Sequence, residues 1–355
     1  MRALATLTDP VYIEPASFSW LDRKALLLLQ DKRDLPFIHL TLRISATLLP
    51  LAVLLFLPGI SNGIWWGLAV AYTGLNNFVF KGPFGLMLHC TSHRPLFRKD
   101  VSWLNRYLPW VIGPLFGQTP ETYFSHHLGM HHPENNLPDD ISSTMYYQRD
   151  SGWGFFHYLG DFLLLGLPRL FNYFWRTRKR TLLKRAARGE FVFVAMCAGL
   201  LFVSWPATLV VFLLPMLLSR VVMMLGNWAQ HAFVDDQQPD NLYTSSITCI
   251  NTVYNHKCWN DGYHISHHVK PTMHWTEHPL SFRKNLAEYV RHDAIVFDGI
   301  HFLHVFVYLM RGRYDLLARH FVNLGDRYET DEQVIALLRS RTQLIPRPVA
   351  VAVAA

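Results

Sequence analysis

Residues 42–80 read LRISATLLPLAVLLFLPGISNGIWWGLAVAYTGLNNFVF. Two apolar arms in this stretch flank the turn Pro58-Gly59-Ile60-Ser61-Asn62-Gly63, which carries no charge. A helix needs about 20 apolar residues to cross a bilayer, and a short uncharged connection suits a hairpin. The stretch therefore predicts two transmembrane helices that form a hairpin within residues 38–80.

A second apolar stretch has the same form. It runs from Phe191 to Trp205, turns at Pro206, and returns from Ala207 to about Gly226. Each arm is near the short end of the roughly 17 to 25 residues that span hydrocarbon. Core helices of a large soluble protein are the alternative, but two such hairpins favour four transmembrane helices.

The composition agrees with a membrane protein. Of 355 residues, 50% are hydrophobic, 14% are aromatic and only 17% are charged. The net charge of +7 suits a cytoplasmic face that rests against anionic lipid headgroups. No basic stripe is interleaved with aromatic residues, so we expect no nucleic-acid partner. The four cysteines form no CxxC pair and are expected to be ordinary buried thiols.

Basic residues precede the first hairpin and fill the segment between the hairpins, including the run from Arg176 to Arg188. The positive-inside rule then places both termini and the central segment in the cytoplasm, at a bacterial inner membrane or the endoplasmic reticulum. Two aromatic-rich stretches, 103–116 and 153–175, are expected to lie in the headgroup layer. A fifth spanning helix is the alternative for the second of them.

These signals divide the chain into five segments. They are a cytosolic N-terminal segment (1–37), the first transmembrane hairpin and a stalk (38–88), a cytosolic or interfacial segment (89–190), the second transmembrane hairpin (191–231) and a cytosolic C-terminal cap (232–355). The predicted fold class is an all-α integral membrane protein whose helical cap holds a histidine-rich site for two metal ions.

Ten side chains that can bind metal fall into four short clusters. The clusters are His89 and His93; His127, His131 and His132; Asn227 and His231; and His264, His267 and His268. Residues three or four apart are neighbours on a helix surface, so each cluster can direct ring nitrogens into one cavity. The chain has 19 histidines, and scattered structural histidines are the alternative. Three clusters with this spacing are hard to obtain by chance, so we predict a metal site.

The ligand type leaves zinc, copper, iron and nickel open, because imidazole suits all four. Nine histidines and an asparagine exceed the three or four ligands of a zinc site and match two ions with four or five ligands each. The HExxH motif is missing, and so are the ExxH pairs of soluble di-iron bundles. A pair of irons is the best candidate, and zinc in a hydrolase is the alternative.

The motifs His89-Cys-Thr-Ser-His93, His127-Leu-Gly-Met-His131-His132 and His264-Ile-Ser-His267-His268 resemble the three histidine boxes of membrane fatty acid desaturases and related hydroxylases. Asn227-Trp-Ala-Gln-His231 is similar to the further ligand pair that those enzymes carry after their fourth spanning helix. The resemblance covers roughly residues 38–279. It implies that the nine histidines bind two non-haem irons, with Asn227 acting through a bound water.

The resemblance also implies the reaction. Such an enzyme uses O2 to insert a double bond into a lipid acyl chain. No HPGG haem-binding signature is present, so we expect a separate electron donor, either a ferredoxin or a b-type cytochrome with its reductase. A di-iron lipid hydroxylase and a carotenoid hydroxylase or ketolase are the alternatives. A haem-bearing electron carrier is a different class, but it would place paired histidines within the spanning helices.

Two further groups of residues are expected near the metals. An apolar tunnel for the acyl chain should be lined by residues from 76–88 and 223–228. A metal-binding imidazole passes its other N–H to a carboxylate or carbonyl. Six acidic residues lie close enough in sequence to accept that hydrogen: Glu134, Asp139, Asp140, Asp235, Asp236 and Asp261.

Overall fold

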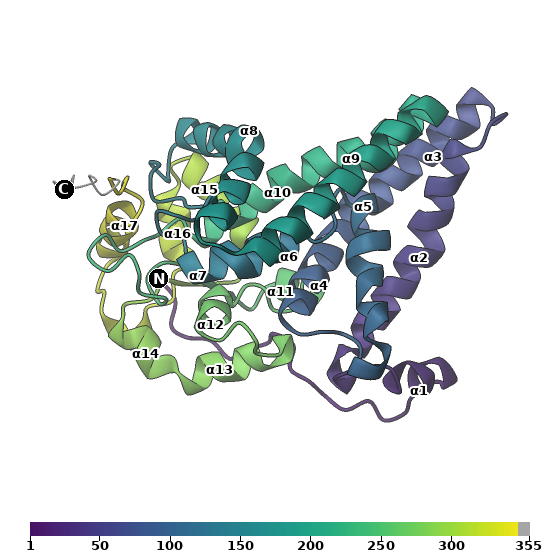
Figure 1. Ribbon diagram of the computed structural model, residues 1–355. Helices are drawn as coiled ribbons and strands as arrows, with labels where there is room; N and C mark the ends of the chain where they lie inside the picture. Colours follow the sequence, from purple (N-terminus) through teal and green to yellow (C-terminus); the bar gives the residue numbers. More distant parts are fainter. Residues whose placement is uncertain (347–355) are drawn as a thin grey trace.

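The computed structural model describes residues 1–346, so positions 347–355 of the predicted cap lie outside the described residues. The chain is mostly helical, which is compatible with the predicted all-α class. In Figure 1, helices α2, α3, α9 and α10 form an arm that points to the upper right, and the C-terminal helices gather at its other end. The N-terminus lies among those C-terminal helices.

The first predicted hairpin is built from α2 (Leu35–Phe56) and α3 (Asn62–Gly74). Gly59 lies in the turn at φ 81°, a left-handed conformation that glycine adopts without steric cost. The Trp65 indole N–H donates to the Leu55 carbonyl at 2.9 Å and fastens the two arms beside the turn. The turn is therefore where the sequence predicts it.

The return arm of this hairpin continues far beyond α3. A π-helical turn, η2 (Leu75–Phe80), leads directly into α4 (Lys81–His93). One helix thus runs from Asn62 to His93 and carries the first histidine cluster on its last turns, as the predicted stalk requires.

The second predicted hairpin is built from α9 (Arg180–Thr208), a π-helical turn η6 (Leu209–Leu213) and α10 (Leu214–Gln230). Ser204 breaks the helix with φ −159° and ψ 102°, two residues before Pro206. Proline cannot donate a helical hydrogen bond, which explains why the chain reverses here. Figure 1 shows α9 and α10 folding back on each other.

Within residues 1–346, two helical segments are long and apolar enough to cross a membrane. They are Lys32–Phe56, and Arg180–Gln230, whose 51 residues contain both arms of the second hairpin. The helix that starts at Asn62 is not among them. The predicted number of four spanning helices therefore stays a proposal.

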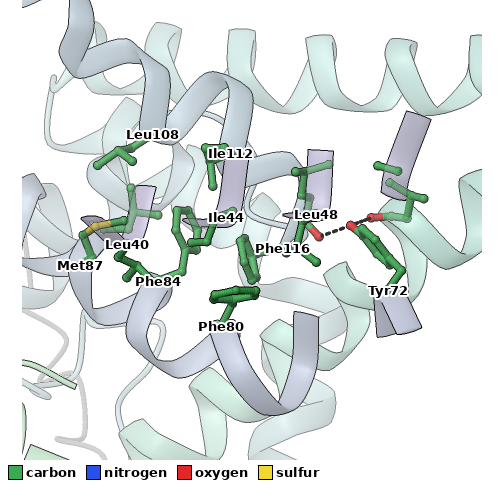
Figure 2. Close-up of a cluster of buried hydrophobic side chains, with 14 of the residues drawn as sticks. Leu40, Ile44, Leu48, Tyr72, Phe80, Phe84, Met87, Leu108, Ile112 and Phe116 are labelled. Carbon is green, nitrogen blue, oxygen red and sulfur yellow. Dashed lines mark hydrogen bonds between the residues drawn. The ribbon is translucent and has the colours of Figure 1, made fainter. Parts of the chain in front are cut away.

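Short helices fill the space between the two hairpins: η3 (Lys99–Arg106), η4 (Leu108–Ile112) and α5 (Gly113–Leu115). The Tyr72 hydroxyl lies between the Leu115 carbonyl at 3.1 Å and the Val211 carbonyl at 3.2 Å, and so joins α3, α5 and η6 (Figure 2). Phe84 stacks on Phe116 with 4.3 Å between ring centroids. Apolar packing of this kind fixes where α4 emerges and hence where its histidines lie.

Helix α8 (Gly152–Arg176) is a single helix that includes Pro168. Phe155 packs on Trp228 of α10 and on Phe306 of α15 (Phe302–Met310), with ring centroids 5.6 and 4.7 Å apart. Helix α8 includes the whole of the predicted headgroup-layer stretch 153–175. The other predicted headgroup-layer stretch, 103–116, spans part of η3 and all of η4 and α5.

The one pair of named strands in residues 1–346 is β1 (Thr248–Ile250) and β2 (Val296–Asp298), which are parallel with Cys249 opposite Phe297. The remaining elements are short and include those of the cap. They are α1 (Trp20–Leu26), η1 (Lys32–Asp34), α6 (Thr122–His126), η5 (His127–His131), α7 (His132–Glu134), α11 (Val253–Lys257), α12 (His264–Val269), η7 (Trp275–Glu277), α13 (His278–Lys284), α14 (Leu286–Arg291), α16 (Tyr314–His320), η8 (Leu324–Asp326) and α17 (Asp331–Ser340).

The N-terminal segment is tied to the cap, a contact that the sequence does not signal. Buried Asp9 accepts hydrogen bonds from the Tyr263 hydroxyl at 2.6 Å and from the Asn251 amide at 2.7 Å. Tyr263 directly precedes α12, so the first residues of the chain support the helix that carries the third histidine box.

Candidate metal centre

Nine histidines that the sequence singles out come together in two groups, and in each group the candidate ligand atoms lie within 4.8 Å of one another. We call them group one and group two. Group one contains His89, His93, His127, His132 and His267. Group two contains His131, His231, His264 and His268. The four members of group two are buried, as are three of the five members of group one.

In group one, Nε2 atoms are packed at regular short distances. His127 Nε2 lies 2.9 Å from His93 Nε2 and 3.0 Å from His132 Nε2. His267 Nε2 lies 2.9 Å from the Nε2 atoms of both His89 and His132. An imidazole nitrogen has either one hydrogen or one lone pair, so it cannot form two such hydrogen bonds at once.

A cation explains these spacings better than hydrogen bonds do. Two nitrogens that bind one ion at about 2.1 Å and at a right angle to each other lie about 3.0 Å apart. Group two has the same spacing, because His264 Nε2 is 3.2 Å from His231 Nε2 and 3.1 Å from His268 Nε2. The all-nitrogen donor sets therefore fit two transition-metal ions.

Local helix geometry decides which histidine joins which group. His89 and His93 are four apart on α4 and share group one, and His264 and His268 share group two in the same way. The second box differs, because η5 is a π-helix in which residues five apart align. His127 and His132 therefore share group one, while His131 turns to group two.

Carboxylates lie beside two of the rings, on the side opposite the ligand atom, and one of the two forms a hydrogen bond. Asp140 Oδ2 lies 2.7 Å from His131 Nδ1, and its Oδ1 accepts from the amide of Ser142 at 2.8 Å. Asp261 Oδ1 lies 3.6 Å from His89 Nδ1. A carboxylate accepts Nδ1–H and leaves the Nε2 lone pair free for a metal. Two of the six predicted carboxylates thus contact metal-binding candidates.

The other four acidic residues have different partners. Glu134 accepts from the Tyr173 hydroxyl at 2.5 Å, and Asp139 pairs with Arg176 at 2.7 Å. Asp235 lies 3.6 Å from Arg341, and Asp236 accepts from the side chain of the adjacent Gln237. These four predictions were wrong, because nearness in sequence does not determine which way a loop turns. His231 uses a carbonyl instead, donating from Nδ1 to Ser245 at 2.7 Å.

Burial favours the neutral form of several of these imidazoles, and the neutral form is the one that binds metal. Loss of solvation, together with neighbouring histidines, lowers the pKa of His93 and of His231 to about 3. The same causes hold the pKa of His127, His264 and His268 well below the ordinary value.

Asn227 is the tenth predicted residue, and it lines the same cavity as His131 and His264, described below. Its amide nitrogen donates to the Ser142 carbonyl at 2.8 Å and to the Tyr158 hydroxyl at 2.7 Å. Its predicted role through a water stays a proposal.

Three other histidines near the boxes belong to neither group. His126, which the sequence pattern leaves out, has its Nε2 3.8 Å from Asp140. His274 Nε2 pairs with Asp34 at 3.0 Å, and His278 Nδ1 contacts the Ser266 hydroxyl at 2.6 Å. The four cysteines are free thiols. Cys197, Cys249 and Cys258 are buried, as predicted, and Cys90 is half-buried.

A cavity of about 400 Å³ opens beside both groups. It lies between α4 and α10, and His89, His127, His131 and His264 line it. Most of the predicted tunnel residues line it as well: Gly82, Phe84, Gly85, Leu86, Leu88, Met223, Met224, Leu225 and Gly226. Asn76 does not line it, because its amide donates to the Leu115 carbonyl at 2.8 Å, and Trp228 is buried against Tyr158.

Sequence reasoning missed several cavity residues. Gln118, Tyr254 and the segment His301-Phe302-Leu303 line the cavity from distant parts of the chain. No motif marks these positions. The packing of α15 against α10 brings His301, Phe302 and Leu303 to the site, whereas Gln118 follows α5 and Tyr254 lies in α11.

Comparison with known proteins agrees with this geometry. The family model described as fatty acid desaturase matches residues 65–299, about two thirds of the chain, and this range includes both groups of histidines. A search of curated proteins and a search of solved structures each found no match. The chain therefore belongs to the fatty acid desaturase family, a family of oxidoreductases that act on acyl lipids with O2.

Proposed function

We propose that this protein is an oxygen-dependent fatty acyl desaturase with two non-haem irons held by the nine histidines of groups one and two. The observation that carries the proposal is the position of two all-nitrogen groups on the wall of one largely apolar cavity. Iron with O2 supplies an oxidant able to remove hydrogen from an unactivated methylene, which no acid or base of the chain can do.

The residues of the chain position the substrate and the metals. Apolar side chains such as Phe84, Leu88 and Met224 bury an acyl chain next to the ligand atoms. Asp140 fixes the tautomer of His131, and Asp261 places a negative charge 3.6 Å from His89 Nδ1. Asn227, whose nitrogen is held by Ser142 and Tyr158, presents its oxygen to a water at the metals.

The surrounding topology forms part of the same proposal. Four helices in two hairpins would cross the bilayer, with both termini and the histidine-bearing cap on the cytoplasmic side. Two long apolar segments and the family support membrane association. Electrons would come from a separate ferredoxin or b-type cytochrome with its reductase.

Expression in a host with known lipids tests the function. We expect a new unsaturated fatty acid in the lipid profile, and its loss in His267→Ala, which removes a group-one nitrogen. His256→Ala is the matched control, because His256 is exposed and belongs to neither group. An unchanged product in His267→Ala at equal protein level would refute the site. A new alcohol in place of the double bond would identify the enzyme as a hydroxylase.

A further inference from the structure

Among residues 1–346, Lys81 is the only lysine or arginine that lines the apolar cavity beside the metal groups. It begins α4, the helix that carries His89, and its side chain is half-buried between α4 and α10. Within residues 1–346, no carboxylate lies within ion-pair distance of its ammonium group. Arg220, the nearest comparable cation of α10, has Glu190 4.0 Å away. One carboxylate, Asp261, lines the same cavity, but it accepts hydrogen bonds from Tyr254 and Gln230 rather than from Lys81. The ammonium group therefore has no direct counter-ion in the described part of the chain.

The hydrogen bonds of Lys81 leave room for a ligand. Nζ lies 2.7 Å from Ser219 Oγ and 3.5 Å from the Pro215 carbonyl. Ser219 donates its own hydrogen to the Phe116 carbonyl at 2.5 Å, so it can only accept from Lys81. An ammonium group has three donors, and these two contacts occupy at most two of them.

We infer that Lys81 binds an anionic group of the lipid substrate, a carboxylate or a phosphate, inside this cavity. An unpaired charge in an apolar environment is unfavourable, and an anion on the ligand removes that cost. A charge-assisted hydrogen bond is also about twice as strong as a neutral one. This inference deepens the proposed function, and it rests on that function for the statement that the ligand is a lipid.

The placement of Lys81 then sets which carbon reacts. Lys81 and His89 are eight residues apart on one uninterrupted helix, which separates their Cα atoms by about 12 Å along the helix axis. An acyl chain whose anionic end is anchored at Lys81 therefore brings the same carbons to the metal groups each time, namely those at a fixed distance from that end. Without the anchor the chain can slide along the apolar walls.

Ligand binding tests the inference without metal or turnover. Purified protein in uncharged detergent is loaded with the fluorescent fatty acid cis-parinaric acid, which is then displaced by hexadecanoic acid, its methyl ester or a lysophosphatidic acid. We expect the wild type to prefer at least one anionic competitor to the methyl ester by at least tenfold. A preference for the free acid identifies a carboxylate, and a preference for the phosphate ester identifies a phospholipid headgroup.

Substitutions assign that preference to Lys81. We expect Lys81→Met to lose the preference while it binds the methyl ester as the wild type does, and Lys81→Arg to keep it. Lys257→Met is the matched control, because Lys257 is exposed and does not line the cavity. A wild type with no preference for anions, or an unchanged preference in Lys81→Met, would overturn the inference. A preference that depends on Lys81 in a protein without desaturase activity would leave Lys81 as an anion site and refute only the proposed reaction.

Discussion

Replacing Asp140 by asparagine should weaken metal binding in group two and leave group one intact. The carboxylate is buried, and its Oδ2 lies 2.7 Å from His131 Nδ1. Its Oδ1 accepts from both the amide and the hydroxyl of Ser142, at 2.8 and 2.7 Å. An asparagine in the same place keeps its oxygen on the two Ser142 donors and turns its NH2 group toward His131.

The consequence follows from the tautomer. An NH2 group facing Nδ1 requires that atom to accept, so the ring hydrogen moves to Nε2, the atom that faces group two. Loss of a hydrogen-bond partner of this kind costs about 10- to 100-fold in metal affinity. This corresponds to about 1.4 to 2.7 kcal/mol at one of the two ions.

Anaerobic titration of the metal-free protein with ferrous iron, in competition with a chelating dye, measures both sites. We expect two sites in the wild type and, in Asp140→Asn, one site of unchanged affinity and one weakened by at least tenfold. Asp139→Asn is the matched control, because Asp139 is the neighbour of Asp140 in sequence but forms a surface ion pair with Arg176. Equal affinities in Asp140→Asn and wild type would refute the tautomer argument.

Three further predictions concern stability. Arg149 is fully buried and donates to the carbonyls of Ala232, Arg341 and Gln343 at 2.6 to 3.0 Å. Arg149→Met should therefore destabilise the protein by about 3 kcal/mol or more, measured by thermal unfolding. Arg311→Met is the control and should leave thermal unfolding unchanged, because Arg311 is exposed. Chelation of the metals should lower the unfolding temperature, because an ion that binds only the folded state stabilises it; an unchanged temperature after verified metal loss would contradict this. In the folded, metal-free protein, histidines whose pKa is lowered to about 3 stay neutral, whereas the same histidines in the unfolded chain bind protons below pH 6.5. The stability from these groups should therefore be complete above pH 6.5 and fall as the pH drops toward 3. Unfolding curves across that range can check this.

Much of the site was predictable because short-range helix geometry determines it. The i,i+4 spacing of His89 and His93 and of His264 and His268 places each pair on one face of its helix, and the structure brings each pair to one group of nitrogens. The hairpin turns were also predictable, since Gly59 and Pro206 mark positions where an apolar helix cannot continue.

The division of the histidines between the two groups required the tertiary structure. Adjacent residues differ in direction by about 100° around a helix, so His267 and His268 face different groups. A sequence window cannot show that His127 and His132 align through a π-helical turn.

The sequence by itself determined that this chain forms apolar hairpins and carries clusters of candidate nitrogen ligands, because both properties depend on residue types and spacings within a few helical turns. Only the tertiary structure decided that Asp140 and Asp261, rather than their acidic neighbours, lie beside those rings. It also decided that Lys81 shares a cavity with those rings. Contacts between distant segments depend on how whole helices pack, and no local pattern encodes that packing.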